Sequence, residues 1–199
     1  MSEKPYSFRT VFSTPWFEIE ESILERQGEM PYYRLTGPDG VICMPFTPEG
    51  EILMVRQHRP ILNLTTLEIP AGAIEDGEHA DQAAEREILE ETGHTCSDLV
   101  ELGPARLHLS RNTHTEHFIL GFNARPSDGA VIEAGIELAI VERAWLKDQV
   151  EIDMIEQATA LSLVGLALAK LDVDLLRDPI DLIRERALDY AERKNQDVR

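Results

Sequence analysis

The stretch Gly72–Gly93, which reads GAIEDGEHADQAAEREILEETG, decides how the rest of this sequence is interpreted. The residues from 69 to 77 include a proline and two glycines, and they predict a loop. From about Ala80 to Thr92 the segment is rich in Ala, Glu, Leu and Ile, which predicts a helix. Gly93 stands in the C-cap position, where a glycine commonly ends a helix.

Three glutamates lie together on this predicted helix. Glu87 and Glu91 are four residues apart and share one face, with Glu90 beside them. Like charges at this spacing destabilise an isolated helix by roughly a few tenths of a kcal/mol, so a positive partner is expected. A divalent cation such as Mg²⁺ fits, because hard cations bind carboxylate oxygens and keep several waters for substrate phosphates. The alternative is a solvated acidic face.

The complete spacing of the segment favours the metal. It resembles the Nudix box, the signature of Nudix hydrolases, at eight positions: Gly72, Glu78, Arg86, Glu87, Ile88, Glu90, Glu91 and Gly93. One position departs, because the family prefers an aliphatic residue after the last glycine and this chain has His94. That place usually packs against the core, so the departure concerns packing and leaves the metal site intact.

The resemblance implies a fold and a mechanism. The fold is an α/β/α sandwich with a mixed sheet, and the reaction is a metal-assisted attack of water on a diphosphate phosphorus. Glu87, Glu91 and the backbone carbonyl of Ala71 would hold Mg²⁺, with Mn²⁺ as a substitute. Glu90 would be a further ligand or would hold the water, and Arg86 would orient a glutamate by a charge-assisted hydrogen bond.

Outside the box the chain is similar to the ADP-ribose pyrophosphatase branch of the family, over roughly residues 8–170. Residues 56–59 (RQHR) and 67–72 (LEIPAG) carry this similarity. It implies that ADP-ribose is cleaved to a nucleoside monophosphate and a sugar phosphate. Two further possibilities stay open: another nucleotide sugar such as GDP-mannose, or a nucleotide-binding module without turnover. The three intact glutamates argue against the pure binding module.

The same resemblance points to substrate contacts. Arg56 and Arg59 would reach the phosphates and Glu68 would contact the base or ribose, although a surface ion pair is the alternative for each. That branch carries Ser-Pro-Gly followed by a glutamate, whereas residues 110–116 here read SRNTHTE. Ser110 and Glu116 match, and we expect Glu116 to bind substrate.

Arg111 stands where the branch has its proline. It would bind a phosphate or a sugar acid, or else lie on the surface. Because the proline belongs to the ADP-ribose marker, this departure leaves the identity of the substrate open.

The catalytic base is expected beyond the box, in the segment before a strand at 137–141. Glu133 is our first candidate and Glu137 our second, and an exposed loop acid is the alternative. Three histidines, at positions 108, 114 and 117, suggest zinc, but their spacing fits no tight metal-binding pattern and no cysteine is nearby. His114 could instead contact substrate.

The composition limits the partners and the compartment. The 199 residues carry a formal net charge of −18, which repels nucleic acid and anionic membranes. No apolar run approaches the roughly 18 residues of a membrane helix, and residues 1–5 do not start a secretory signal. Cys43 and Cys96 fit a reducing environment, so we expect a cytoplasmic protein.

Three regions are predicted along the chain. Residues 1–40 alternate polar and apolar side chains, which predicts a layer of short strands, and the resemblance places this layer against a second subunit as a homodimer interface. Residues 41–175 are the catalytic domain, and residues 176–199 are a helical extension. Within the domain we expect an antiparallel hairpin from strands at 41–46 and 52–55. The other expected elements are strands at 99–102, 106–109 and 116–122 and helices at 144–150, 156–170 and 179–193.

Overall fold

The structure, a computed structural model, describes residues 7–23, 30–151 and 158–197. Its strands, in chain order, are β1 (Arg9–Ser13), β2 (Glu18–Ile23), β3 (Pro31–Thr36), β4 (Gly40–Pro45), β5 (Ile52–Arg59), β6 (Leu64–Glu68), β7 (Ala71–Ala73), β8 (His94–Thr95), β9 (Asp98–Ala105), β10 (Glu116–Phe122), β11 (Arg125–Pro126) and β12 (Ile136–Val141). The helices are α1 (Ala80–Thr92), α2 (Arg143–Glu151), α3 (Ala158–Leu171) and α4 (Ile180–Asp197).

A mixed four-stranded sheet forms the centre of the molecule, with strand order β7-β4-β10-β9. β4 and β10 run parallel, with Ile42 opposite Phe118, and the two outer pairings are antiparallel. A parallel pair needs a long crossover connection, and here the crossover contains α1. The expected mixed sheet is therefore present.

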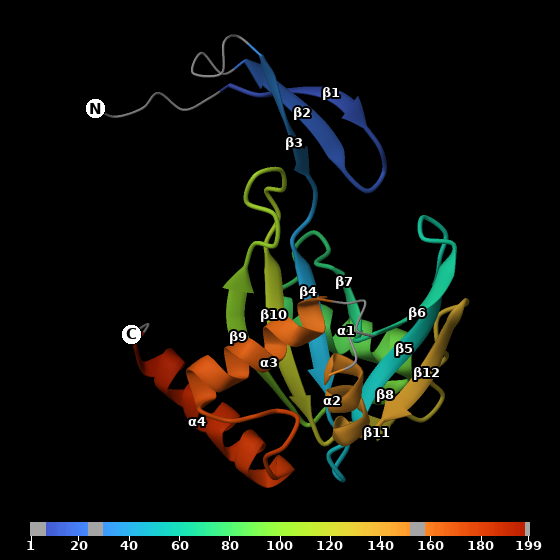
Figure 1. Cartoon of the computed structure of the whole chain (residues 1–199), viewed down its shortest axis with the longest axis vertical. Coiled ribbons are helices and arrows are strands. Elements are labelled where there is room, and N and C mark those ends of the chain that lie inside the picture. Colours follow the sequence, from blue (N-terminus) through green and yellow to red (C-terminus); the bar gives the residue numbers. More distant parts are fainter. Residues whose placement is uncertain (1–6, 24–29, 152–157, 198–199) are drawn as a thin grey trace.

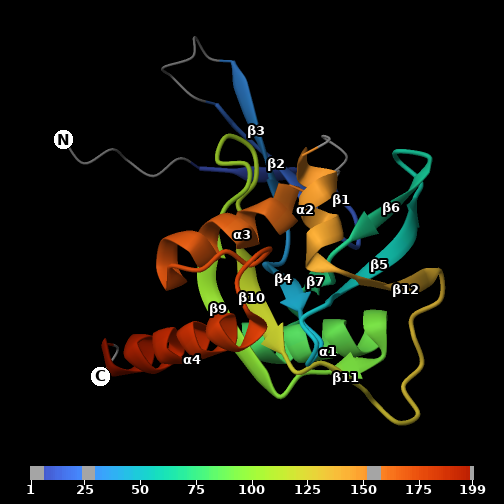
Figure 2. The same ribbon diagram turned by 60° about the horizontal axis from the view of Figure 1, so that its bottom comes forward.

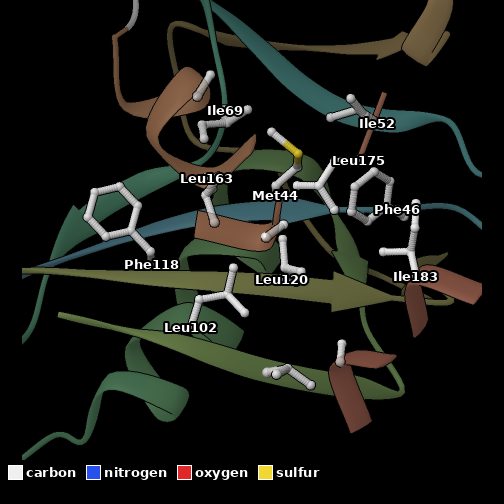
Figure 3. Close-up of a cluster of buried hydrophobic side chains, with 14 of the residues drawn as sticks. Met44, Phe46, Ile52, Ile69, Leu102, Phe118, Leu120, Leu163, Leu175 and Ile183 are labelled. Carbon is white, nitrogen blue, oxygen red and sulfur yellow. The ribbon is translucent and has the colours of Figure 1, made fainter. Parts of the chain in front are cut away.

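Helices cover both faces of this sheet, as Figures 1 and 2 show. Successive residues of a strand point to opposite faces, so β4 contributes to two separate cores. Val41 and Cys43 pack against α1, whereas Ile42 and Met44 pack toward α3 and α4. The larger of these two clusters appears in Figure 3, where Leu163 of α3 and Ile183 of α4 lie among the strand residues. The predicted α/β/α sandwich is confirmed.

The predicted hairpin is wrong, although both of its strands exist. β4 pairs with β7 and β10, whereas β5 pairs with β6 and β12 in a second, antiparallel sheet. Only a single bridge, Phe46 to Ile52, joins the two strands. Every residue of β4 is buried, and a strand that is apolar on both faces carries no pattern that selects its partner.

The predicted strand at 106–109 is also wrong. The ladder between β9 and β10 begins where Glu116 meets Ala105, so residues beyond 105 have no partner strand there. Leu107 and Leu109 alternate with polar residues as in a strand, but both are exposed. They belong to the connection between β9 and β10, residues 106–115, which we call the β9–β10 loop.

The N-terminal strand layer is present as a separate antiparallel sheet of order β1-β2-β3. It stands away from the central sheet, and the β9–β10 loop rises toward β3 (Figure 1). Residues 1–6 and 24–29 of the expected layer lie outside the described residues.

The predicted helices are confirmed with small shifts at their ends. α1 covers the predicted residues 80–92, and Gly93 follows with a left-handed φ of 70° while its N–H donates to the Leu89 carbonyl. The first two residues expected in the helix at 156–170 lie outside the described part of the chain. Within the described ranges, no helix is long and apolar enough to span a membrane.

Candidate active site

A cleft of about 480 Å³ lies where the N-terminal sheet, the central sheet and the second sheet meet. This volume is typical of pockets that hold small ligands. Residues from several separate segments line it: Trp16, Phe17, Leu35, Gly37–Ile42, Arg59, Glu68, Ala71–Ala73, Leu107, His114, Glu116 and Thr159. β7 lines this cleft and also contacts the acidic face of α1, so the cleft lies next to that face.

Glu87 and Glu91 point from α1 toward β7 and are almost fully buried, at 8% and 5% exposure. The Ala71 N–H donates to Glu91 Oε2 at 3.1 Å. A Cβ on Gly72 would lie 2.0 Å from Glu87 Oε1, so a glycine is required for this close approach. Burial raises the pKa of Glu87, and burial together with the charges of Glu87 and Glu133 raises the pKa of Glu91 to about 7.

Arg86 is the cation that holds this cluster together. Its Nη1 donates to Glu87 at 2.6 Å and to Glu90 at 3.2 Å. Its Nε and Nη2 both donate to the Glu78 carboxylate, and Nη2 also reaches the Ala73 carbonyl at 2.8 Å. One guanidinium therefore connects the helix to the loop that precedes it, with Glu78 as an anchor whose pKa Arg86 lowers.

The donor set fits a hard divalent cation. Two buried carboxylates with raised pKa values lie beside the β7 backbone, and Arg86 supplies only one positive charge. Burying charged carboxylates without enough positive charge is costly, and oxygen donors suit Mg²⁺ or Mn²⁺. No three His, Cys, Asp or Glu side chains among the described residues converge as a closed metal site. The ligands would be Glu87, Glu91 and the Ala71 carbonyl.

The two candidates for the catalytic base lie in different places. The Glu133 N–H donates to the Glu90 carbonyl at 2.8 Å, and its charge is felt by Glu87 and Glu91. Glu137 stands opposite Arg56 in the pairing of β12 with β5. The structure thus brings Glu133, and not Glu137, to the acidic cluster.

Of the two predicted phosphate-binding arginines, one lines the cleft. Arg59 forms a bidentate ion pair with Glu68, with N–O distances of 2.7 and 2.6 Å, and both residues line the cleft. Arg56 is three residues earlier in the same strand, so it points to the opposite face and is exposed. The ion pair, with a hydrogen bond from Thr66, keeps the pKa of Glu68 below its ordinary value.

Glu116 lines another wall of the cleft, at the start of β10. Its Oε1 lies 3.4 Å from His114 Nε2, and a Cβ on Gly40 would lie 2.4 Å from its Oε2. Burial raises the pKa of Glu116, with His114 opposing the shift. His117 instead pairs with Glu101, at 2.8 Å.

Arg111 does not line the cleft. Its guanidinium lies 4.6 Å from the centre of the Tyr32 ring, and its Nη1 donates to the Ser110 carbonyl.

His94, the departure from the box, is buried with its Nδ1 2.7 Å from the Thr92 carbonyl, so a hydrogen bond accommodates its polar ring.

Sequence reasoning missed the contributions of Trp16, Phe17 and Thr159 to the cleft. The N-terminal layer as a whole was expected at a subunit interface, and the alternation of its residues carries no information about which other segment each side chain faces. Thr159 is an ordinary helical residue by pattern. Its hydroxyl is buried without a hydrogen-bond partner among the described residues.

Comparisons with known proteins agree with this architecture. Residues 37–149 match the family model of the NUDIX domain. An ADP-ribose pyrophosphatase of Bacillus subtilis is 45% identical over 65 residues, 33% of this chain and 35% of that protein. An ADP-sugar pyrophosphatase of Mus musculus is 46% identical over 54 residues, 27% of this chain and 24% of that protein. The matches therefore span about a third or less of these relatives.

Two further proteins are similar to this chain. A methanol dehydrogenase activator of Bacillus methanolicus is 42% identical over 62 residues, 31% of this chain and 34% of that protein. Among solved structures, an ADP compounds hydrolase superposes with a TM-score of 0.70 over 86% of this chain and 97% of that chain. Its 20% sequence identity means that this likeness concerns the fold alone.

The burial of Glu91 predicts that the free energy of unfolding of the metal-free protein depends on pH. Because its folded pKa of about 7 lies above the ordinary value of 4.5, its stabilising contribution is complete below pH 4.5 and is lost as the pH rises through about 7. In the presence of a chelator, Glu91→Gln should therefore raise the free energy of unfolding at pH 8 by roughly 2–3 kcal/mol. Near pH 4.5 it should have little effect. Urea denaturation at the two pH values measures the difference.

The matched control is Glu85→Gln, on the exposed face of the same helix. This variant should change the stability little at either pH. An equal effect of Glu91→Gln at pH 4.5 and pH 8 would contradict the prediction.

Proposed function

Because this chain belongs to the Nudix family, we propose that it is a metal-dependent hydrolase of the diphosphate linkage in nucleoside diphosphate derivatives, with ADP-ribose as substrate. The observation that carries the proposal is the pair of buried glutamates, Glu87 and Glu91, held against β7 beside a cleft of ligand size. The names of the relatives, ADP-ribose pyrophosphatase and ADP-sugar pyrophosphatase, support the choice of substrate.

The proposed roles of the residues follow from their positions. Mg²⁺, or Mn²⁺ in its place, would neutralise the phosphate oxygens and activate the attacking water when bound by Glu87, Glu91 and the Ala71 carbonyl. Arg86 keeps the glutamates oriented, and Glu90 lies beside them on the exposed edge of the cluster.

Glu133 would take the proton from the attacking water. Its backbone is tied to the last turn of α1 by the hydrogen bond to the Glu90 carbonyl, so it stays near the cluster. It is exposed, and a glutamate carboxylate is a suitable group to accept a proton as a general base.

Arg59, Glu68 and Glu116 would bind the substrate. Arg59 brings positive charge to the cleft, which attracts the diphosphate, while its bond to Glu68 fixes its direction. The carboxylates of Glu68 and Glu116 are acceptors suited to hydroxyl groups of a ribose. Arg56, exposed on the other face of β5, is not part of this arrangement.

A substrate panel tests the proposal. With Mg²⁺, ADP-ribose should be cleaved to AMP and ribose phosphate faster than GDP-mannose or other nucleotide sugars, as measured by chromatography of the products. Glu91→Gln keeps the shape of the side chain but removes a ligand charge, so turnover should fall by a factor on the order of 100 or more at limiting Mg²⁺. A wild-type protein that binds these nucleotides without cleaving any of them would support the nucleotide-binding module instead.

The choice of catalytic base predicts a contrast between two variants. Glu133→Gln should lower kcat by a factor on the order of 100, because the general base is lost. Glu137→Gln, on the face of the second sheet that carries Arg56, should lose far less. Measuring kcat against pH for both variants decides which glutamate is the catalytic base. A larger loss of kcat in Glu137→Gln than in Glu133→Gln would reverse the assignment.

We further propose that the protein is a homodimer through the layer at residues 1–40. Several large apolar side chains on this layer are exposed: Val11 (45%), Phe12 (54%), Trp16 (76%), Ile23 (53%), Met30 (63%) and Tyr33 (42%). A sheet of three short strands cannot bury this surface alone, and a second copy would cover it.

Light scattering at micromolar concentration should therefore give twice the chain mass of 22.5 kDa. Phe12→Asp should shift the protein toward monomer, because a charge would be buried at the interface. Leu168→Asp, at an exposed apolar position on α3, is the control and should leave the mass unchanged. A monomeric wild type would contradict the proposal.

The compartment follows as part of the same proposal. Both cysteines, Cys43 and Cys96, are free thiols. Free thiols persist in a reducing compartment, so a protein that has them and acts on a nucleotide derivative is suited to the cytoplasm.

A further inference from the structure

The N-terminal sheet is joined to the rest of the chain by contacts with the β9–β10 loop. The Leu35 N–H donates to the Arg111 carbonyl at 2.8 Å, and the Thr113 N–H donates to the Leu35 carbonyl at 3.1 Å. Leu35 and Asn112 form an isolated parallel bridge between these two hydrogen bonds. The end of β3 is thus paired with the backbone of the loop.

Side chains form a second contact between the N-terminal sheet and the loop, close to the first. The Arg111 guanidinium lies over the Tyr32 ring at 4.6 Å, a cation–π arrangement. The Tyr32 hydroxyl and Arg111 Nη1 both donate to the Ser110 carbonyl. We call this group of three residues, Tyr32, Ser110 and Arg111, the latch.

The two segments joined by the latch both line the cleft. The loop contributes Leu107 and His114 and leads into Glu116, whereas the N-terminal sheet and its turn contribute Trp16 and Phe17. The geometry of the cleft therefore depends on how firmly the sheet is held against the loop.

A proline at position 111 could not form this latch. The Arg111 N–H donates to the His108 carbonyl at 3.0 Å and would be lost, and the side chain would carry no cation. The arginine supplies both the backbone donor and a planar charged group that stacks on the tyrosine.

We propose that Arg111 is a positioning residue, which holds the N-terminal sheet on the β9–β10 loop through Tyr32 and so sets the cleft for substrate binding. The proposal rests on the proposed function to the extent that the substrate occupies this cleft. It assigns Arg111 no contact with the substrate, and its effect passes through Tyr32.

The first test measures the latch without any substrate. Hydrogen exchange should speed up about two- to fivefold at the Leu35 and Thr113 amides in Arg111→Ala, which corresponds to the ~0.5–1 kcal/mol of an exposed cation–π contact. The Cys43 amide, bonded to the Pro70 carbonyl in the core, should be unchanged and serves as the internal control. Arg111→Lys keeps the cation and should show an intermediate rate. Unchanged exchange at Leu35 and Thr113 in Arg111→Ala would overturn the proposal.

The second test is a double-mutant cycle on the KM for ADP-ribose. Arg111→Ala and Tyr32→Leu should each raise KM about two- to fivefold with little change in kcat. The double variant should be no worse than either single variant, because both changes break the same contact. Arg125→Ala, which removes an exposed arginine of β11, should leave KM unchanged.

The outcomes separate this proposal from the proposed function. If Arg111→Ala raises KM while Tyr32→Leu does not, or if the two effects multiply, Arg111 acts on the substrate directly and the latch is overturned. If the wild type does not cleave ADP-ribose, the proposed function fails, while the exchange rates at Leu35 and Thr113 still decide whether the latch exists.

Discussion

The constraint on which the rest of the structure depends is the burial of two carboxylates, Glu87 and Glu91, against the backbone of β7. Their burial raises both pKa values, so the arrangement is costly unless positive charge reaches it. Arg86 supplies one charge and ties α1 to the loop before it. Gly72 has to be a glycine because the Glu87 carboxylate takes the place of a side chain. The small hydrophobic core around Ile88 packs α1 against the central sheet and so fixes the position of both glutamates relative to β7.

How far the sequence predicts this structure depends on the range of the interactions involved. α1 was predicted to its last residue because helix propensity and the glycine cap act within a few residues. The acidic face was predicted because helical spacing alone brings Glu87 and Glu91 together. The partners of β4 were not predicted, since its neighbours β7 and β10 lie far away in the sequence and its buried residues carry no alternation.

The directions of two arginine side chains near the site could not be predicted, for similar physical reasons. Arg56 and Arg59 were treated as one basic group, but a spacing of three in a strand sends the two side chains to opposite faces. Arg111 was predicted either to bind a phosphate or a sugar acid or to lie on the surface, and its residue type alone does not decide between them. An arginine also stacks on an aromatic ring, and Tyr32 comes from a segment almost 80 positions earlier. Residue type indicated the chemistry in each case, while the direction of the side chain depended on tertiary structure.

The parallel pairing of β4 with β10 has a consequence for how such a protein can diversify. Both strands start at the same edge of the sheet, with Glu116 opposite Gly40, so the connections that enter them lie side by side at the mouth of the cleft. Neither connection takes part in the two hydrophobic cores. Insertions and substitutions there are tolerated far better than changes within the sheet. Descendants of one ancestral chain can therefore acquire new ligand preferences at this edge while the acidic helix and its chemistry are inherited without change.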